Sequence, residues 1–190
     1  PDEVIAQHDV INLTDRVRDG ELTWKAPAGK WKIVRFGFGL TGKQNHPASP
    51  EATGLEVDKL DPVAWKKYFD TYFEMYKDAA GGLMGEKGIQ YVLTDSYEAG
   101  AETWTPAMLT EFKARRGYDM LPWMPVLTGQ IIGSAEASEK FLWDWRKTHS
   151  ELIAENYDRL TAFAKERGMK GRYSEAHENG RLYLVDGMDV

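Results

Sequence analysis

The chain has 190 residues, 42% of them hydrophobic, and a formal net charge of −6, which suits one domain or one domain with a small attached piece. The acidic balance and the scattered basic residues exclude an electrostatic surface for nucleic acid. No apolar run approaches the roughly 18 residues of a membrane span, and the absence of cysteine excludes disulfides and thiolate chemistry.

The first forty residues differ in pattern from the rest of the chain. A turn is predicted at Pro27 to Gly29, and residues 31–40 alternate in size as a strand does, so this region predicts a β-hairpin. A polar stretch rich in glycine, proline and asparagine follows, from Thr41 to about Thr53. We therefore divide the chain into a hairpin segment with the start of a loop at residues 1–45, and a second part at residues 46–190.

A helix is predicted over residues 62–80, where aromatic side chains recur at intervals of three and four residues. The pair Asp61-Pro62 provides an N-cap and a proline in the first turn, and the pair Gly81-Gly82 ends the helix. A short apolar strand is predicted directly afterwards, at residues 89–94.

Two further helices follow this strand. One is predicted over residues 106–116 with Thr105 as its N-cap, and a longer one over residues 135–167, from a cap at Ser134 to Gly168. The long helix has one broad apolar stripe, on which His149 is expected to be a core residue rather than a catalyst. The stripe consists of Phe141, Trp145, His149, Leu152, Asn156, Leu160 and Phe163.

Carboxylates follow each of two predicted strands. Asp95 and Glu98 come after the strand at residues 89–94, and a second strand, at residues 169–175, ends on Glu175. The residues behind it are His177, Glu178 and Asn179. The order of helices and strands predicts an α/β fold with a parallel sheet. If both strands lie in that sheet, Glu98 and Glu175 open onto the same edge, where catalytic residues of such folds lie.

Several short motifs occur along the chain in a fixed order. They are Trp24-Lys-Ala-Pro-Ala-Gly-Lys-Trp31, Gly54-Leu-Glu-Val-Asp-Lys59, Asp95-Ser-Tyr-Glu98, Trp104-Thr105, Glu111-Phe112, Arg115-Arg-Gly-Tyr118, Leu121-Pro-Trp-Met-Pro125, Gly129 and Phe141-Leu-Trp-Asp-Trp-Arg146. Together they resemble the α-L-rhamnosidases of glycoside hydrolase family 106, and the resemblance covers most of the chain. Its most specific part is the segment from Asp95 to Glu98 with the two motifs that follow it.

The resemblance implies a (β/α)8 catalytic barrel that hydrolyses terminal α-L-rhamnosyl residues of plant or microbial polysaccharides with inversion, and a calcium ion that helps to hold the sugar. Since a complete barrel takes about 250 residues, the chain is expected to be part of a barrel, truncated at both ends, with an amino-terminal hairpin. Its partners would be a carbohydrate substrate and the rest of the parent polypeptide. Polysaccharide breakdown favours export to the periplasm or the cell surface.

Cleavage of a glycosidic bond requires one carboxyl group that protonates the leaving oxygen and a second that activates water or attacks the sugar. We predict Glu98 as the general acid and Glu175 as the general base, although the sequence leaves open which carboxylate takes which role and whether one lies past Val190. The sequence leaves two other roles open for Glu175: a calcium ligand together with Glu178, because calcium prefers oxygen ligands, or a residue that hydrogen-bonds sugar hydroxyl groups.

The candidate substrate-binding residues are Asp95, Tyr97, Trp104, His177 and Asp58. Two of them have structural alternatives: Asp95 would hydrogen-bond a loop backbone, and Asp58 would cap the first helix. A competing function for the whole chain is that of a non-catalytic part of a larger barrel protein, which binds carbohydrate or supports a neighbouring domain.

Overall fold

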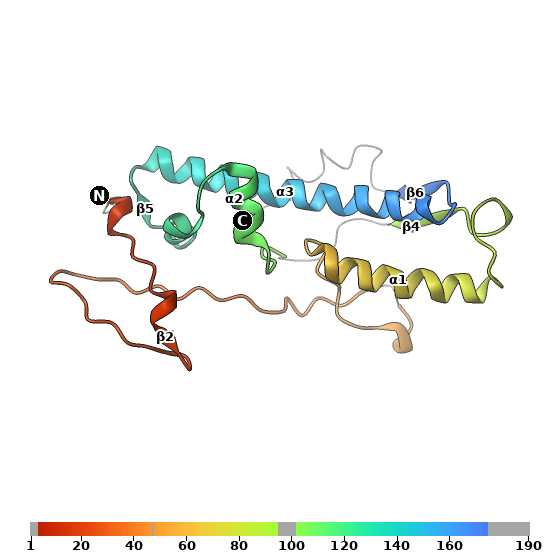
Figure 1. Cartoon of the computed structure of the whole chain (residues 1–190), viewed down its shortest axis with the longest axis horizontal. Coiled ribbons are helices and arrows are strands. Elements are labelled where there is room, and N and C mark those ends of the chain that lie inside the picture. Colours follow the sequence, from red (N-terminus) through yellow and green to blue (C-terminus); the bar gives the residue numbers. More distant parts are fainter. Residues whose placement is uncertain (1–3, 47, 95–101, 175–190) are drawn as a thin grey trace. The chain divides into compact units, whose positions relative to one another are not determined.

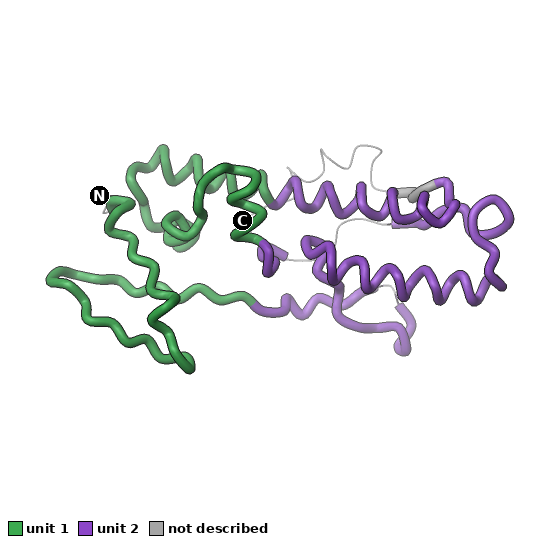
Figure 2. The backbone as a smooth tube through the Cα atoms, viewed as in Figure 1, with its two compact units in different colours: residues 1–38, 108–148 green, residues 39–107, 149–190 purple. Residues whose placement is uncertain are grey.

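The computed structural model describes residues 4–46, 48–94 and 102–174, and it describes only the backbone of residues 171–174. Contacts within the chain divide it into two compact units (Figure 2). Unit 1 consists of residues 1–38 and 108–148, and unit 2 consists of residues 39–107 and 149–190. The boundary falls within one continuous helix, so both units use part of it.

Helices dominate the described residues, and the strands are short (Figure 1). The α-helices (α), 3₁₀ helices (η) and strands (β) are, in chain order, β1 (Val4–Ile5), η1 (Gln7–Asp9), η2 (Thr14–Arg16), β2 (Val17–Arg18), β3 (Glu21–Leu22), η3 (Pro50–Ala52), α1 (Pro62–Ala79), η4 (Gly85–Lys87), β4 (Tyr91–Thr94), α2 (Met108–Arg116), η5 (Leu121–Thr128), β5 (Ile131–Ile132), α3 (Ala135–Glu166) and β6 (Gly171–Ser174). The described residues form three two-stranded sheets and no closed barrel. The chain is therefore a mixed α/β structure, as the order of the predicted elements indicated.

The amino-terminal hairpin lies at a different place from the predicted one. Strands β2 and β3 pair antiparallel, with Arg18 opposite Glu21, across an Asp19-Gly20 turn in which both residues have positive φ (51° and 82°). Such a two-residue turn matches the twist of the strands that it joins. The prediction of a strand over residues 31–40 was wrong: that segment has no regular secondary structure, and the indole N–H of Trp31 closes the loop by donating to the carbonyl of Pro27 at 2.9 Å.

Helix α1 has the ends that its sequence predicts. The Asp61 carboxylate accepts a hydrogen bond from the backbone N–H of Val63 at 2.8 Å, and a proline occupies the first turn. At the other end, Gly81 and Gly82 take positive φ and donate backbone hydrogen bonds to the last turn of α1, with Gly82 N–H reaching the Lys77 carbonyl at 2.8 Å. Glycine adopts this left-handed conformation without steric cost, so the helix stops here.

The long helix α3 also begins and ends as predicted. The Ser134 hydroxyl oxygen accepts from Ala137 N–H at 3.0 Å, and beyond the last turn Met169 N–H donates to the Ala164 carbonyl at 3.1 Å while Gly168 N–H donates to the Lys165 carbonyl at 3.0 Å. This pair of bonds is a Schellman motif. All seven residues of the predicted apolar stripe are buried. In the part of the chain that the structure describes, no helix has the length and hydrophobicity needed to cross a membrane.

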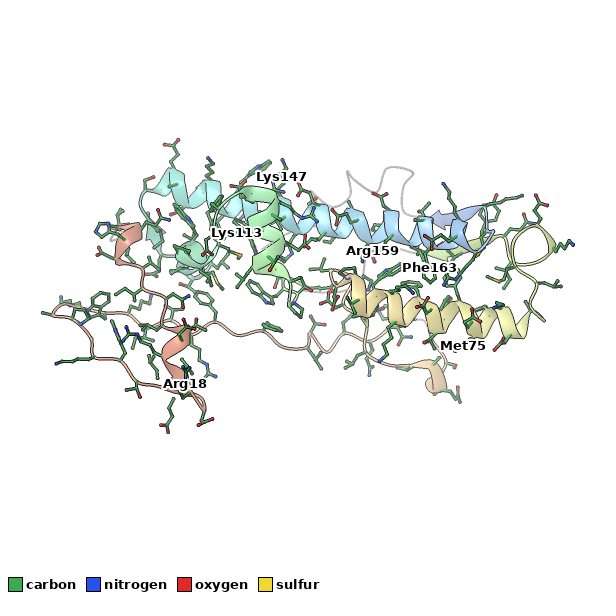
Figure 3. The ribbon with its side chains drawn as sticks, in the orientation of Figure 1. Arg18, Met75, Lys113, Lys147, Arg159 and Phe163 are labelled. Carbon is green, nitrogen blue, oxygen red and sulfur yellow. The ribbon has the colours of Figure 1, made fainter. Side chains whose placement is uncertain are left out.

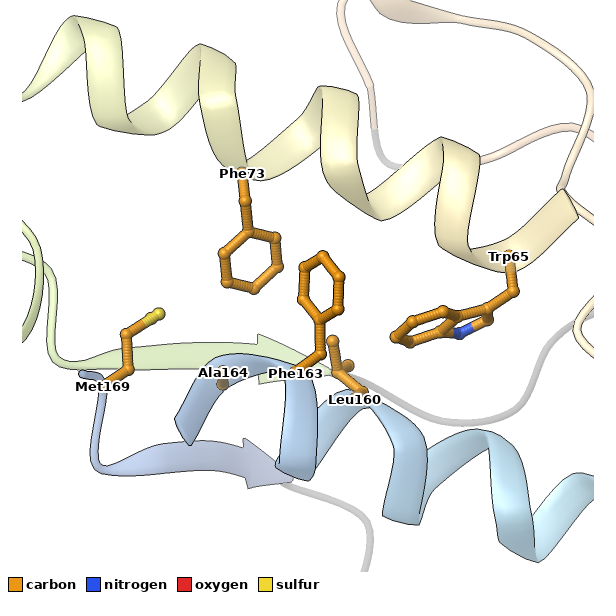
Figure 4. Packing of buried hydrophobic residues seen from close by; sticks show 6 residues of the cluster. All are labelled: Trp65, Phe73, Leu160, Phe163, Ala164 and Met169. Carbon is orange, nitrogen blue, oxygen red and sulfur yellow. The ribbon is translucent and has the colours of Figure 1, made fainter. Parts of the chain in front are cut away.

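An aromatic core in unit 2 joins α1, the second half of α3 and the turn after it. Phe163 lies edge-on to Trp65 and to Phe73, with ring centroids 5.4 Å and 5.2 Å away, and it points from α3 toward α1 (Figure 4). The buried residues of this cluster are Trp65, Phe73, Leu160, Phe163, Ala164 and Met169. Edge-to-face aromatic pairs add about 0.5–1.5 kcal/mol to the gain from burial. The aromatic residues predicted to recur over residues 62–80 are not all buried, since Tyr76 of α1 is 48% exposed.

Strands β4 and β6 form a parallel pair, which confirms the predicted parallel arrangement of these two segments. Tyr91 is opposite Gly171 and Thr94 is opposite Ser174, so the strands end at matching positions. Val92 of β4 packs against the aromatic core. A two-stranded sheet is marginally stable alone and needs such packing against helices. The core therefore fixes the end of β4.

We expect Gly85→Ala to destabilise unit 2. A Cβ atom at this position would lie 2.5 Å from the carbonyl oxygen of Gly168, and φ at Gly85 is +67°. Because the N–H of Gly168 donates in the Schellman motif of α3, a shift of the Gly168 backbone away from the new Cβ would strain that motif, and the expected cost exceeds about 1 kcal/mol. Faster amide hydrogen exchange in α1 and in the second half of α3 would measure it.

Gly82→Ala is the matched control for this experiment. Gly82 also has a positive φ, +82°, but no atom lies within 4 Å of the position that its Cβ would take. The difference between the two variants therefore isolates the contact with Gly168. Equal exchange rates in both variants would contradict the prediction.

Candidate active site

The structure describes two of the predicted site residues, Asp58 and Trp104. The others lie outside the described residues, and their predicted roles stay predictions. They are Asp95, Tyr97, Glu98, Glu175, His177 and Glu178. The structure describes the strands that lead into segments 95–101 and 175–178, and the residues that hold these strands in place.

The carboxyl ends of β4 and β6 define one edge of the parallel pair. Thr94 and Ser174 are partners in the register, and in the sequence the next residues are Asp95 and Glu175. In α/β folds the loops that leave such an edge carry the reactive side chains, because parallel strands end there together and the helices follow. The pairing thus provides the frame that the predicted site requires.

Asp58 lies in the loop that leads into α1 and accepts three hydrogen bonds. Its Oδ1 accepts from the backbone N–H groups of Leu60 at 2.8 Å and Asp61 at 3.0 Å, and its Oδ2 accepts from the Thr105 hydroxyl at 2.9 Å. The first two bonds close a turn immediately before the N-cap of α1. These contacts give Asp58 a structural role, although the residue that caps α1 is Asp61 and not Asp58 as the structural alternative had it, and the contact of Asp58 with a sugar stays a prediction.

A second contact joins the same two segments of the chain. Glu102 Oε1 accepts from the backbone N–H of Lys59 at 2.8 Å. The Lys59 ammonium group in turn lies 2.7 Å from Glu56 Oε2, in a pair whose side chains are only 20% and 27% exposed. The loop at residues 56–61 and the segment at residues 102–105 are therefore held together at two points.

Thr105 has a different role from the predicted one. It was predicted to cap a helix at residues 106–116, but α2 begins at Met108, and the Thr105 hydroxyl donates to Asp58 instead. Thr105 is fully buried at 0% exposure. A buried hydroxyl needs a partner, and a carboxylate is a stronger acceptor than a neutral group, which explains why this bond forms. Trp104, next to it in the chain, is half-buried.

Two polar residues of α3 have structural roles. His149 is 1% exposed, as predicted for a core residue, and burial lowers the pKa of its ring to about 4. A general acid or base works best with a pKa near the operating pH, so His149 is a poor candidate at neutral pH. Asp144 accepts a hydrogen bond from the Tyr118 hydroxyl at 3.0 Å, which ties α3 to the segment after α2.

Sequence reasoning missed the anchors at Thr105 and Glu102. Thr105 and Asp58 are 47 positions apart, and Glu102 and Lys59 are 43 apart, so no local pattern indicates either contact. The available signal was Asp58 itself, an aspartate shortly before an N-cap, where its side chain can bond to backbone N–H groups. That signal predicts the turn but not the partner across the fold.

A calcium site is not visible in the described part of the chain. Among residues 4–46, 48–94 and 102–174, no group of three or more His, Asp or Glu side chains is arranged to hold a metal ion. The predicted ligands Glu175 and Glu178 lie outside this part. The described residues therefore provide no binding site for the ion.

A parallel strand pair with acidic residues after its carboxyl ends is a frame that glycoside hydrolases use, since their chemistry requires two carboxyl groups on different strands or loops. A family model described as alpha-L-rhamnosidase matches residues 1–190. The chain therefore belongs to the α-L-rhamnosidase family, glycoside hydrolase family 106, and the resemblance seen in the sequence is confirmed.

Two relatives place this assignment in context. The chain is 43% identical to a rhamnosidase from Novosphingobium sp. PP1Y, whose solved structure it matches with a TM-score of 0.78 over 90% of this chain and 17% of that one. It is also 41% identical to a protein of Formosa agariphila named "Putative beta-glucuronidase". The 184 aligned residues cover 96% of this chain and 15% of that protein. The chain thus spans about a sixth of the length of these relatives.

Proposed function

We propose that the protein containing this chain hydrolyses terminal α-L-rhamnosyl residues of plant or microbial polysaccharides with inversion at the anomeric carbon. The observation that carries the proposal is the parallel register of β4 and β6, which supports a common edge for the carboxylates that follow Thr94 and Ser174. Membership of the α-L-rhamnosidase family supports the choice of sugar.

In the proposed mechanism, Glu98 is protonated in the enzyme–substrate complex and gives its proton to the glycosidic oxygen as the bond to the anomeric carbon breaks. Glu175 takes a proton from a water molecule whose oxygen attacks that carbon from the opposite face, so the configuration inverts. Each turnover leaves Glu98 ionised and Glu175 protonated, and exchange with solvent restores both. Room for the water requires the two carboxyl groups to be roughly 6.5–9.5 Å apart.

We assign the remaining candidates to the sugar itself. Asp95, Tyr97, Trp104 and His177 would bind the rhamnosyl ring, through hydrogen bonds to its hydroxyl groups and through aromatic contact. Within this proposal β4 and β6 are neighbouring strands of a (β/α)8 barrel, and their carboxyl ends belong to the catalytic face. Calcium bound by Glu175 and Glu178, and export of the enzyme to the periplasm or cell surface, are further parts of the proposal.

The name of the Formosa agariphila relative favours a second candidate function, hydrolysis of β-glucuronides. Fold does not decide between sugars, because the pocket determines the substrate. The full-length protein should therefore be assayed with matched aryl α-L-rhamnosides and aryl β-glucuronides. We expect kcat/KM for the rhamnoside to exceed that for the glucuronide by about 100-fold or more, since a site that hydrogen-bonds one sugar rejects another.

Three other outcomes of this assay would each redirect the proposal. Cleavage of the glucuronide alone would establish the second candidate, and binding of a sugar without release of the aryl group would indicate a non-catalytic carbohydrate-binding protein. The anomer that is released first can be observed by NMR. Initial release of α-L-rhamnose from the rhamnoside would contradict inversion, because an inverting enzyme releases the β-anomer first.

A further inference from the structure

We propose that Asp58 and Thr105 form a positioning pair for the candidate general acid Glu98, because they hold in place the described residues that follow segment 95–101. This inference rests on the function proposed above for Glu98. It adds a role for two residues that do not touch the reacting atoms, and it follows from how the described residues on either side of segment 95–101 are held.

The upstream end of this segment is fixed by the sheet. Residues 95–101 follow Thr94, the last residue of β4, and Thr94 is paired in parallel with Ser174 of β6. Val92, two positions earlier, packs against the aromatic core of unit 2. The strand end therefore has little freedom to shift relative to that core.

The downstream end is fixed by side chains. Residue 102 begins the described segment after the loop, and Glu102 Oε1 accepts from Lys59 N–H at 2.8 Å. Three positions later the buried Thr105 hydroxyl donates to Asp58 Oδ2 at 2.9 Å. Both bonds lead to the same short loop before α1, so this loop holds residues 102–105 in place.

The loop before α1 is itself tied to the core. Asp58 Oδ1 binds the N–H groups of Leu60 and Asp61, and Leu60 is 1% exposed. Asp61 caps α1, and its carbonyl accepts from Trp65 N–H at 2.9 Å. Trp65 packs edge-on to Phe163 in the centre of the core. A continuous series of hydrogen bonds thus connects the core to Thr105.

One carboxylate therefore performs two tasks, because Oδ1 of Asp58 holds the turn before α1 and Oδ2 holds Thr105. Loss of the second contact would leave an oxygen of Asp58 without its donor, and Glu102 alone would then hold the described segment at residues 102–105 to the loop before α1. A displacement of about 1 Å in a catalytic group is enough to cost about 100-fold in rate. The pair is thus expected to act on proton donation rather than on binding of the sugar.

The test compares Thr105→Val, which keeps the shape and removes the hydroxyl, with Thr105→Ser, which keeps the hydroxyl. In the full-length protein, kcat and KM are measured on phenyl and 2,4-dinitrophenyl α-L-rhamnosides. For the phenyl substrate, whose poor leaving group needs protonation, we expect Thr105→Val to lower kcat by about 10- to 100-fold with KM within about twofold. For the dinitrophenyl substrate, kcat of Thr105→Val should fall by less than about threefold. The Thr105→Ser variant should keep most of the wild-type kcat on both substrates.

A loss of equal size on both substrates would overturn the inference, because a purely structural role does not distinguish leaving groups. A wild-type protein that cleaves neither rhamnoside would instead refute the proposed function. In that case hydrogen exchange still tests the pair: Thr105→Val should speed exchange of the amides at residues 95–101 and leave α2 unchanged. Unchanged exchange at residues 95–101 would overturn the inference on its own.

Asp58→Asn provides an independent variant if Thr105→Val does not fold. Asparagine keeps an oxygen for the N–H groups of Leu60 and Asp61, but its NH2 group can only donate to the Thr105 hydroxyl, so a neutral hydrogen bond of reversed direction replaces the charge-assisted one. A smaller loss than in Thr105→Val is expected, with the same preference for the phenyl substrate. The double variant Asp58→Asn/Thr105→Val should lose no more than Thr105→Val alone, and additive losses would contradict a shared contact.

Discussion

Glu98→Gln is expected to lower kcat of the full-length protein on phenyl α-L-rhamnoside by about 10²- to 10⁴-fold, the usual contribution of general acid catalysis. Glutamine has the shape of glutamic acid but no acidic proton to give to the leaving oxygen. Substrates with an electron-poor aryl group should lose much less, because they depart without protonation. The alkaline limb of the pH profile of kcat, which reports loss of the proton from the acid, should also disappear.

Glu86→Gln is the matched control, since it makes the same chemical change at an exposed glutamate in η4 of the same unit. This variant is expected to retain the activity of the wild-type protein. Circular dichroism of both variants verifies that the fold is intact. Turnover of Glu98→Gln near the wild-type value would remove Glu98 from the mechanism and leave the general acid to be found elsewhere.

Phe163→Ala is expected to destabilise unit 2 by about 3–5 kcal/mol, the range for loss of a buried phenylalanine from a core. Its ring contacts Trp65 and Phe73 edge-on, and the guanidinium group of Arg167 lies 3.4 Å from its centroid. The ring lies between α3 and α1 (Figure 4), so truncation removes these contacts and is expected to leave a cavity there. Amide hydrogen exchange of α1 and of the second half of α3 would report the loss.

Met75→Ala is the control for this experiment, because Met75 also lies on α1 but is 58% exposed (Figure 3). Surface substitutions of this kind change stability by less than about 0.5 kcal/mol. Exchange in Phe163→Ala that resembles exchange in Met75→Ala would mean that the cluster around Phe163 does not hold α1 and α3 together.

The elements that the sequence predicted well are those with strong local signals. Asp61-Pro62 and Gly81-Gly82 define the two ends of α1 because capping and left-handed glycine conformations depend on neighbouring residues alone. The stripe on α3 could be predicted because a helix that packs on one face needs apolar residues at a helical period, and all seven predicted positions are buried.

The misplaced hairpin and the misassigned Thr105 have a common physical cause. An alternating pattern at residues 31–40 is compatible with a strand, but a strand also requires a hydrogen-bonding neighbour, which a local pattern does not specify. Thr105 has the right residue type and position for an N-cap. Its hydroxyl instead donates a hydrogen bond to the carboxylate of Asp58, 47 positions away. Tertiary structure decides both cases: residues 31–40 pair with no strand among the described residues, and a distant carboxylate outweighs the local preference of Thr105.

For the candidate site, the sequence predicted the frame. The alternation of helices and strands indicated a parallel pair, and β4 and β6 form it in register. The predicted roles of Glu98 and Glu175 follow from residue type, position after a strand and family resemblance. The described contacts add the anchors that local patterns do not contain, at Asp58, Glu102 and Thr105.

The two anchors around residues 95–101 have a practical consequence for enzyme engineering. Loops that follow a strand can be exchanged between related enzymes when both junctions keep their positions. Here the junctions are Thr94 in the paired strand and Thr105 bonded to Asp58. A library that replaces residues 95–101 with those of other family members should therefore keep Asp58, Lys59, Glu102 and Thr105 unchanged, so that the residues on either side of the exchanged segment keep their positions.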